Sequence, residues 1–199
     1  NRNQHRKRVD LTLRGFAGFA RGRPDARLYL HMGMRDMGCD VVRLAAELGI
    51  ADRLLTTSRS DGHPHVSDKH LNLIYNACDV GVNTASAEGW GLVSFEHAAA
   101  GAPQVVPSGG ACARLWEGTG IVAEPSRVDE ALVTLYSDAV LRAELGGRCR
   151  ALARSPRFSW GEVAARWEEL LKACMRDGTR GTQDSNLESP VLETGALAN

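Results

Sequence analysis

The chain has 199 residues, of which 43% are hydrophobic and 24% are charged, and its 24 basic residues balance its 24 acidic residues. This is the composition of an ordinary globular protein with a proper core, and it excludes bulk electrostatic attraction to nucleic acid or to an anionic membrane. No apolar run approaches ~18 residues, so we expect no transmembrane helix.

Hydrophobic periodicity predicts helices that alternate with short strands along the chain. The predicted helices cover residues 9–20, 41–48, 68–78, 128–153 and 161–175, with a further helix from the turn at 88–91 to residue 100. The predicted strands cover residues 26–32, 53–57, 80–84, 104–107 and 120–123. Gly49 and Ser67 are the expected C-cap and N-cap of two helices, and a break is expected near Asp138 or Gly146.

This alternation indicates an α/β fold built on a Rossmann-like, doubly wound parallel sheet, in which ligands bind outside the carboxyl ends of the strands. Residues 1–176 are the expected domain. Residues 177–199 are polar and aperiodic, and we expect them to be a disordered tail. Because the chain opens on Asn1 rather than Met, a fragment of a longer protein is also expected.

The chain carries five cysteines: Cys39, Cys78, Cys112, Cys149 and Cys174. Their number is odd and none has Cys-x-x-Cys spacing, which argues against a disulfide framework and against a structural zinc site. Scattered cysteines of this kind indicate a reducing compartment, so a cytoplasmic location is expected.

Most of the functional information lies in residues 88–96, Glu-Gly-Trp-Gly-Leu-Val-Ser-Phe-Glu. Glu88 and Glu96 bracket a Gly-x-Gly turn that opens a helix. Backbone N–H groups and the positive end of the helix dipole at such a turn favour a phosphate group. The carboxylates are suited to accept hydrogen bonds from hydroxyls. A diphosphate together with hydroxyls describes a sugar nucleotide.

A basic cluster, Arg2, Arg6, Lys7 and Arg8, stands just before the first predicted helix. A preceding strand would end there, and the loop at 84–91 follows the strand at 80–83. Both features are therefore predicted at the same edge of the sheet, which favours a phosphate site over a merely solvated cluster.

These motifs resemble the C-terminal half of a GT-B-fold retaining glycosyltransferase of family 4, also called glycosyl transferases group 1. The resemblance covers roughly residues 1–176. Its core runs from Leu73-Ile-Tyr-Asn-Ala-Cys-Asp-Val through Ser86-Ala-Glu-Gly-Trp-Gly-Leu to Phe95-Glu96 and Gly101-Ala-Pro-Gln-Val-Val-Pro. The opening Arg2-(x4)-Lys7 with Val9-Asp10-Leu11, and the later Phe158-Ser159-Trp160, are also similar to family segments.

The resemblance implies a role for each matching residue. Arg2 and Lys7 would neutralise the donor diphosphate, and Glu88 would hold the hydroxyls of the transferred sugar. Glu96 would accept hydrogen bonds from the ribose. The start of the helix would meet the sugar and phosphate through Gly89, Trp90, Gly91 and Leu92. We expect no metal and no cofactor, with a UDP- or GDP-sugar as donor substrate.

Three positions depart from the family pattern. Arg8 stands where the lysine is usually followed by Gly, Trp90 where Phe is usual, and His97 where Ala is common. The N-terminal acceptor-binding domain of the family is not in this sequence, so the chain is expected to be inactive alone. That domain would supply the acceptor, a glycan, lipid or protein, and any peripheral contact with a membrane.

Other interpretations of the sequence remain open. The chain would suit another GT-B enzyme, such as a sugar-nucleotide epimerase, or a catalytically inactive module that binds nucleotides or proteins. Residues Asp61, His63, His65, Asp68 and His70 look like metal ligands but have no recognised ligand spacing. We expect them to form a solvated loop near the nucleotide base.

Overall fold

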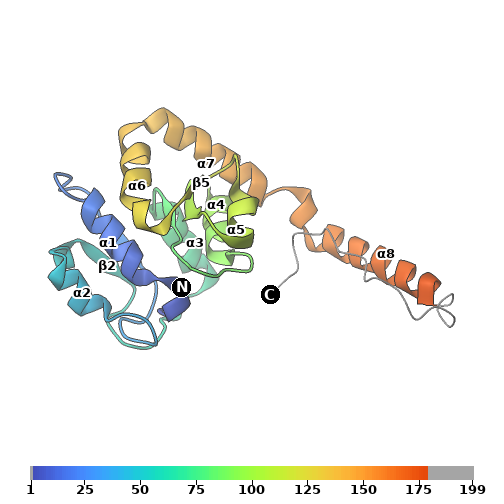
Figure 1. Ribbon diagram of the computed structural model, residues 1–199, viewed down its shortest axis with the longest axis horizontal. Coiled ribbons are helices and arrows are strands. Elements are labelled where there is room, and N and C mark those ends of the chain that lie inside the picture. The colour runs from blue at the N-terminus through green and yellow to red at the C-terminus, as the bar shows by residue number, and fades with distance from the viewer. Residues whose placement is uncertain (1, 179–199) are drawn as a thin grey trace.

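The computed structural model describes residues 2–178, the last two without their side chains. Helices pack on parallel strands in a compact α/β body, and helix α8 extends away from it (Figure 1). The predicted tail at 177–199 lies outside the described residues except for its first two positions.

The elements follow one another as the periodicity predicts. The helices are η1 (His5–Lys7), α1 (Val9–Phe19), α2 (Val41–Glu47), η2 (Ala51–Arg53), α3 (Asp68–Ala77), α4 (Leu92–Ala100), α5 (Gly110–Trp116), η3 (Pro125–Arg127), α6 (Val128–Ser137), α7 (Ala139–Ala153), η4 (Pro156–Phe158) and α8 (Trp160–Gly178). The strands are β1 (Leu28–Leu30), β2 (Leu54–Thr56), β3 (Gly81–Val82), β4 (Gln104–Pro107) and β5 (Ile121–Ala123). Helix α5 was not predicted.

All strand pairs are parallel, as predicted, but they form two separate ladders instead of one sheet. One ladder pairs β1 with β2, and the other has the order β3-β4-β5. In a doubly wound sheet of order 3-2-1-4-5-6, the first strand lies between the two halves. The described chain has η1 and α1 before β1, and no strand in that place, which is why its two ladders are not joined by hydrogen bonds.

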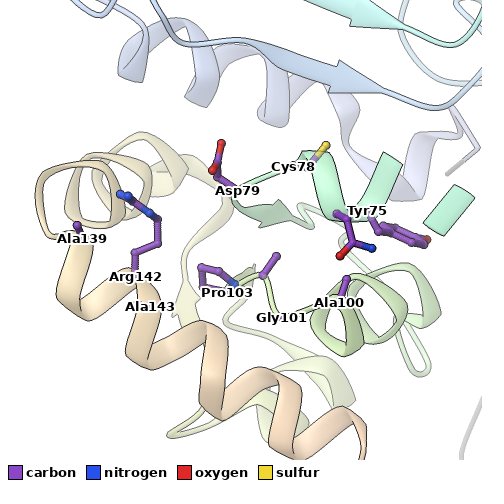
Figure 2. A pocket seen from close by; sticks show the side chains of 11 residues that line it. Tyr75, Cys78, Asp79, Ala100, Gly101, Pro103, Ala139, Arg142 and Ala143 are labelled. Carbon is purple, nitrogen blue, oxygen red and sulfur yellow. The ribbon is translucent and has the colours of Figure 1, made fainter. Parts of the chain in front are cut away.

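A cavity of about 290 Å³ lies at the amino ends of β3 and β4 (Figure 2). Asp79 and Pro103, which lead into these two strands, line it together with Tyr75 of α3 and Arg142 of α7. This end of the sheet is opposite to the one at which ligands of doubly wound folds bind.

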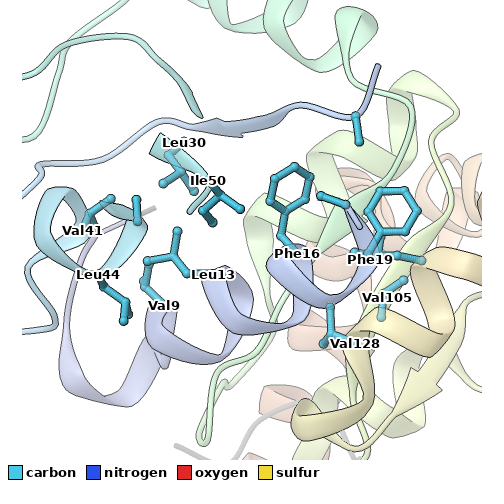
Figure 3. Packing of buried hydrophobic residues seen from close by; sticks show 14 of the residues in the cluster. Val9, Leu13, Phe16, Phe19, Leu30, Val41, Leu44, Ile50, Val105 and Val128 are labelled. Atoms are coloured by element: carbon cyan, nitrogen blue, oxygen red, sulfur yellow. The ribbon is translucent and has the colours of Figure 1, made fainter. Parts of the chain in front are cut away.

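The main core joins the two ladders through helix α1 (Figure 3). Leu13 and Phe16 of α1 are 0% and 3% exposed, and they belong to the same buried cluster as Leu30 of β1 and Val105 of β4. Gly15 allows α1 to approach α6 closely, because a Cβ there would lie 2.8 Å from Val128. The position of α1 is therefore fixed from both sides.

The predicted break in the long helix occurs at Asp138 and not at Gly146. The Asp138 carboxylate accepts a hydrogen bond from the N–H of Leu141 at 2.8 Å and so caps α7. Gly146 lies inside α7, where its lack of a side chain lets the helix pass over the carbonyl of Gly101. The same glycine that suggested a break thus serves helix packing.

Helix α8 has 19 residues and carries large exposed apolar side chains. Trp160, Leu171 and Met175 are 87%, 56% and 73% exposed. Among the described helices, none combines the length and apolar character needed to cross a membrane.

Candidate functional site

The predicted turn between strand and helix lies at the carboxyl end of β3. It ends at Gly91, whose φ of 80° is left-handed and which is the N-cap of α4. A Cβ at Gly91 would lie 3.2 Å from the sulfur of Cys112, so glycine suits this position for space as well as for conformation. No side chain of the cap satisfies the first N–H groups of α4, and the helix start can therefore receive an anion.

Lys7 and Glu88 meet at this turn as an ion pair. The Lys7 ammonium donates to Oε2 of Glu88, and the two side chains are only 10% and 13% exposed. Arg6, which is 50% exposed, places Nη1 3.6 Å from the same oxygen. The structure thus brings together the predicted Lys7 and Glu88, and it adds Arg6, to which the sequence assigned no role beyond the basic cluster.

Hydrogen bonds made by the backbone and by the Arg6 side chain tie the segment before α1 to the loop after β3. The N–H of Ser86 donates to the carbonyl of Arg6 at 2.8 Å, and Nη1 of Arg6 donates to the carbonyl of Ala87 at 3.2 Å. The Lys7–Glu88 pair lies between these attachments. The two segments that carry Lys7 and Glu88 are therefore held together by contacts other than the ion pair itself.

The backbone conformation of Arg8 shows why the family usually has glycine at this position. Its φ and ψ are both 46°, and among the described residues no other non-glycine residue has a positive φ. Glycine adopts this left-handed conformation without strain, which accounts for the usual Gly at this position. The Arg8 guanidinium makes two 3.0 Å hydrogen bonds to Asp10, and these lower the pKa of that carboxyl.

Glu96 lies on the second turn of α4 and is exposed. Its Oε2 accepts a hydrogen bond from the Tyr75 hydroxyl at 2.7 Å. Burial, and then the bond to Glu96, raises the pKa of Tyr75 above its usual range, so the phenol remains a donor. The Tyr75 ring stacks on His97 with centroids 5.4 Å apart. Tyr75 belongs to the sequence motif at 73–80, but that motif does not predict its contact with Glu96.

Trp90 packs among aromatic rings and is half-buried. Its ring lies 5.6 Å from that of Phe95 and 5.2 Å from that of Phe158 in η4. The neighbouring Gly89 and Leu92 are exposed, Leu92 by 64%. The turn therefore has an aromatic side that packs on the protein and an open side.

Arg2 occupies a different place from Lys7. Its guanidinium pairs with Asp36 at 3.7 Å, and its side chain is 62% exposed. The ion-pair partners of Glu88 are Lys7 and Arg6. The role of Arg2 toward a diphosphate stays a prediction.

The histidines of the loop at 57–66 pack against one another. The His63 ring lies 5.3 Å from that of His31 and 6.3 Å from that of His65, both edge-on. The described part of the chain contains no group of three or more His, Cys, Asp or Glu side chains arranged to hold a metal ion. Whether this loop lies near a nucleotide base stays a prediction.

Known proteins resemble the chain in sequence, although no protein-family model matches it. D-inositol 3-phosphate glycosyltransferase of Stackebrandtia nassauensis is 33% identical over 159 residues, which are 75% of this chain and 33% of that protein. Mannosylfructose-phosphate synthase of Agrobacterium fabrum is 26% identical over 177 residues, 83% of this chain and 38% of that protein. The chain thus spans about a third of the length of the curated relatives it matches.

Solved structures share its fold. Sucrose-phosphate synthase from Thermosynechococcus elongatus has a TM-score of 0.72 at 22% identity, over 89% of this chain and 44% of that one. HepE from Anabaena, in complex with UDP, has a TM-score of 0.71 at 20% identity, over 87% and 47%. The C-terminal domain of a glycosyl transferase group 1 family protein from Francisella tularensis has a TM-score of 0.68 at 16% identity, over 78% and 82%. These structures show that the chain has the GT-B fold, and the sequence relatives support a glycosyltransferase domain of group 1.

Proposed function

We propose that this domain binds the nucleoside-diphosphate sugar donor of a glycosyltransferase. The observation that carries the proposal is the Lys7–Glu88 ion pair, which joins the start of α1 to the carboxyl end of β3. A cation for phosphate and a carboxylate for hydroxyls lie side by side, next to the uncapped start of α4. A sugar nucleotide carries both a diphosphate and hydroxyl groups, so a site that binds it needs both a cation and a carboxylate.

Lys7 and Arg6 are the proposed charge partners of the donor diphosphate. Glu88 holds both cations, and a carboxylate has about four acceptor positions, so it keeps capacity for the hydroxyls of the sugar. As the bond between the anomeric carbon and the phosphate oxygen breaks, negative charge grows on the leaving diphosphate. Fixed cations stabilise that charge without any rearrangement.

Glu96 is the proposed partner of the ribose hydroxyls. Tyr75 occupies Oε2, and the carboxylate as a whole is exposed, so Glu96 still has acceptor positions for the ligand. The Tyr75 bond orients the carboxylate before the ribose arrives. A preorganised acceptor loses less conformational entropy when the ligand binds.

The comparisons favour UDP as the nucleotide. HepE has been solved with UDP, with UDP and glucose, and with UDP-glucose.

We further propose transfer with retention, in which the acceptor oxygen bonds to the anomeric carbon on the face that the phosphate leaves. The departing phosphate oxygen takes the acceptor proton. Lys7, Arg6 and the α4 N-terminus supply the positive charge, so no metal takes part, and the acceptor is bound by a part of the protein outside this chain.

Isothermal titration calorimetry of this chain with UDP, GDP and ADP, in buffer containing EDTA, tests the proposal. We expect saturable UDP binding that weakens roughly 10-fold or more in Lys7→Met, since a charge-assisted hydrogen bond is lost. The matched control is Lys172→Met on α8, whose exposed ion pair with Glu168 lies outside the site. Equal affinities of wild type, Lys7→Met and Lys172→Met in folded proteins would refute the donor site.

A further inference from the structure

Two threonine hydroxyls support the strained turn at Arg8. Oγ1 of Thr84 lies 2.8 Å from the Arg8 carbonyl oxygen, 3.2 Å from that of Lys7 and 2.7 Å from Oγ1 of Thr12. Thr84 follows β3 and is 2% exposed, while Thr12 belongs to α1. Thr84 is therefore buried and Thr12 is half-buried, and their hydroxyls lie next to the backbone of Lys7 and Arg8.

The direction of these hydrogen bonds follows from the groups involved. A carbonyl oxygen only accepts, and a threonine hydroxyl has a single proton to donate. Thr84 must therefore donate to the carbonyl of Arg8, with that of Lys7 as a longer second acceptor. The proton between the two hydroxyls then comes from Thr12. The order Thr12 to Thr84 to Arg8 leaves each donor with an acceptor.

This chain of hydrogen bonds connects the two halves of the candidate site. Thr84 stands on the same loop as Glu88, and its acceptors are the backbone carbonyls of Lys7 and Arg8. The left-handed conformation of Arg8 directs the chain from η1 into α1 and so sets where Lys7 points. A non-glycine residue keeps this conformation only where its surroundings hold it.

We propose that Thr84 is a positioning residue for donor binding. Its hydroxyl, oriented by Thr12, holds the left-handed turn at Arg8 and thereby keeps the Lys7 ammonium beside Glu88, where the donor diphosphate binds. The inference rests on the proposed role of Lys7. It adds that Lys7 can bind the diphosphate only because the neutral, buried hydroxyl of Thr84 fixes the backbone at Lys7 and Arg8.

Thr84→Val and Thr84→Ser separate the hydroxyl from the packing. Valine keeps the branched shape and loses the hydrogen bonds, whereas serine keeps the hydroxyl and loses a methyl group. The carbonyl of Arg8 still accepts from the N–H of Leu11 at 2.9 Å in either variant, so it is not left unpaired. We expect roughly 10-fold weaker UDP binding in Thr84→Val and a change of less than about 3-fold in Thr84→Ser, measured by calorimetry.

A double-mutant cycle with Lys7 distinguishes positioning from a general loss of structure. If Thr84 acts through Lys7, then Lys7→Met and Lys7→Met/Thr84→Val bind UDP equally. Additive losses, or wild-type affinity in folded Thr84→Val, would overturn the inference while leaving the donor site intact. Wild-type affinity in Lys7→Met would instead refute the proposed function and this inference with it.

Thr12→Val provides a second route should Thr84→Val fail to fold. It removes the donor that orients Thr84 and leaves the bond from Thr84 to Arg8 possible. We expect an intermediate loss of UDP affinity, about 3-fold, which disappears in the Lys7→Met background. A loss of the same size in both backgrounds would show that Thr12 acts on the fold and not on the position of Lys7.

Discussion

The two glutamates that bracket the start of α4 are held in opposite ways. Glu88 lies on a loop tied to residues 6–8, its side chain is 13% exposed, and two cations compensate its charge. Glu96 is exposed on the helix and has one neutral partner, the Tyr75 hydroxyl. The Glu88 side is therefore built into the fold, and the Glu96 side remains open to solvent and ligand.

This difference separates stability from binding. A charge that is mostly removed from water needs its partner, and removal of that partner destabilises the fold. An exposed carboxylate contributes little to folding and keeps its acceptor positions for a ligand. Substitutions around Glu88 should lower stability and donor affinity together, and substitutions around Glu96 should lower affinity alone.

The largest effect is expected from Lys7→Ala on the Glu88 side. It leaves a mostly buried carboxylate with only the longer contact to Arg6, and the free energy of unfolding should fall by about 2–3 kcal/mol. Urea denaturation followed by far-ultraviolet circular dichroism measures this change. Lys172→Ala, which breaks an exposed pair with Glu168, should stay within about 0.5 kcal/mol of wild type. Equal stability of the two variants would mean that the Lys7–Glu88 pair stabilises the fold no more than an exposed pair does.

Glu96→Ala tests the Glu96 side of the comparison. We expect the free energy of unfolding to change by less than about 0.5 kcal/mol and UDP affinity to fall roughly 10-fold. Wild type should prefer UDP over 2′,3′-dideoxy-UDP, and the variant should bind both equally, because the ribose contact is gone. Glu47→Ala on α2 is the matched surface control. A preserved preference in Glu96→Ala would place the ribose elsewhere.

A smaller effect is expected at Arg8, where glycine and alanine can be compared directly. Both substitutions lose the pair with Asp10, and only glycine is relaxed at a φ of 46°. Arg8→Gly should therefore be more stable than Arg8→Ala by about 1 kcal/mol in urea denaturation. Indistinguishable stabilities would mean that the turn is not left-handed in solution.

The smallest effect concerns pH and His97, which lies beneath Tyr75 on the Glu96 side. Burial lowers the pKa of His97, so the unfolded chain binds its proton more readily than the folded chain. The corresponding stability is present above about pH 6.5 and is lost as the pH falls toward the lower, folded-state pKa. The urea midpoint of His97→Gln should fall less between pH 7 and pH 5 than that of wild type. Part of the slope will remain, because burial also lowers the pKa of His31 and His63.

The sequence predicted the frame of the site better than its internal contacts. The strand, the Gly-x-Gly turn and the following helix were recognisable because each depends on neighbouring residues. Lys7 and Glu88 were expected at one sheet edge from topology. The partners Arg6, Tyr75 and Thr84 were not assigned, because their roles depend on pairings between distant segments and on the φ of one residue, which no local pattern encodes.

The same distinction explains the differences in the fold. Helix α5 has seven residues and begins at Gly110, so it offers too little periodicity to be seen. Gly146 suggests a helix break because glycine has a low helix propensity. Its close approach to the carbonyl of Gly101, which favours glycine inside α7, cannot be read from the sequence. Local propensity predicted where elements lie, and contacts between elements determined their ends.

The packing of Trp90 gives the site an intrinsic optical probe. The chain has four tryptophans, of which Trp160 and Trp167 are exposed on α8 and Trp116 is fully buried. Replacing the two on α8 by phenylalanine would leave emission from a shielded indole and from Trp90, whose ring lies beside the turn at Glu88. A change in wavelength or quantum yield would then report events at that turn in real time, without a label attached to the protein.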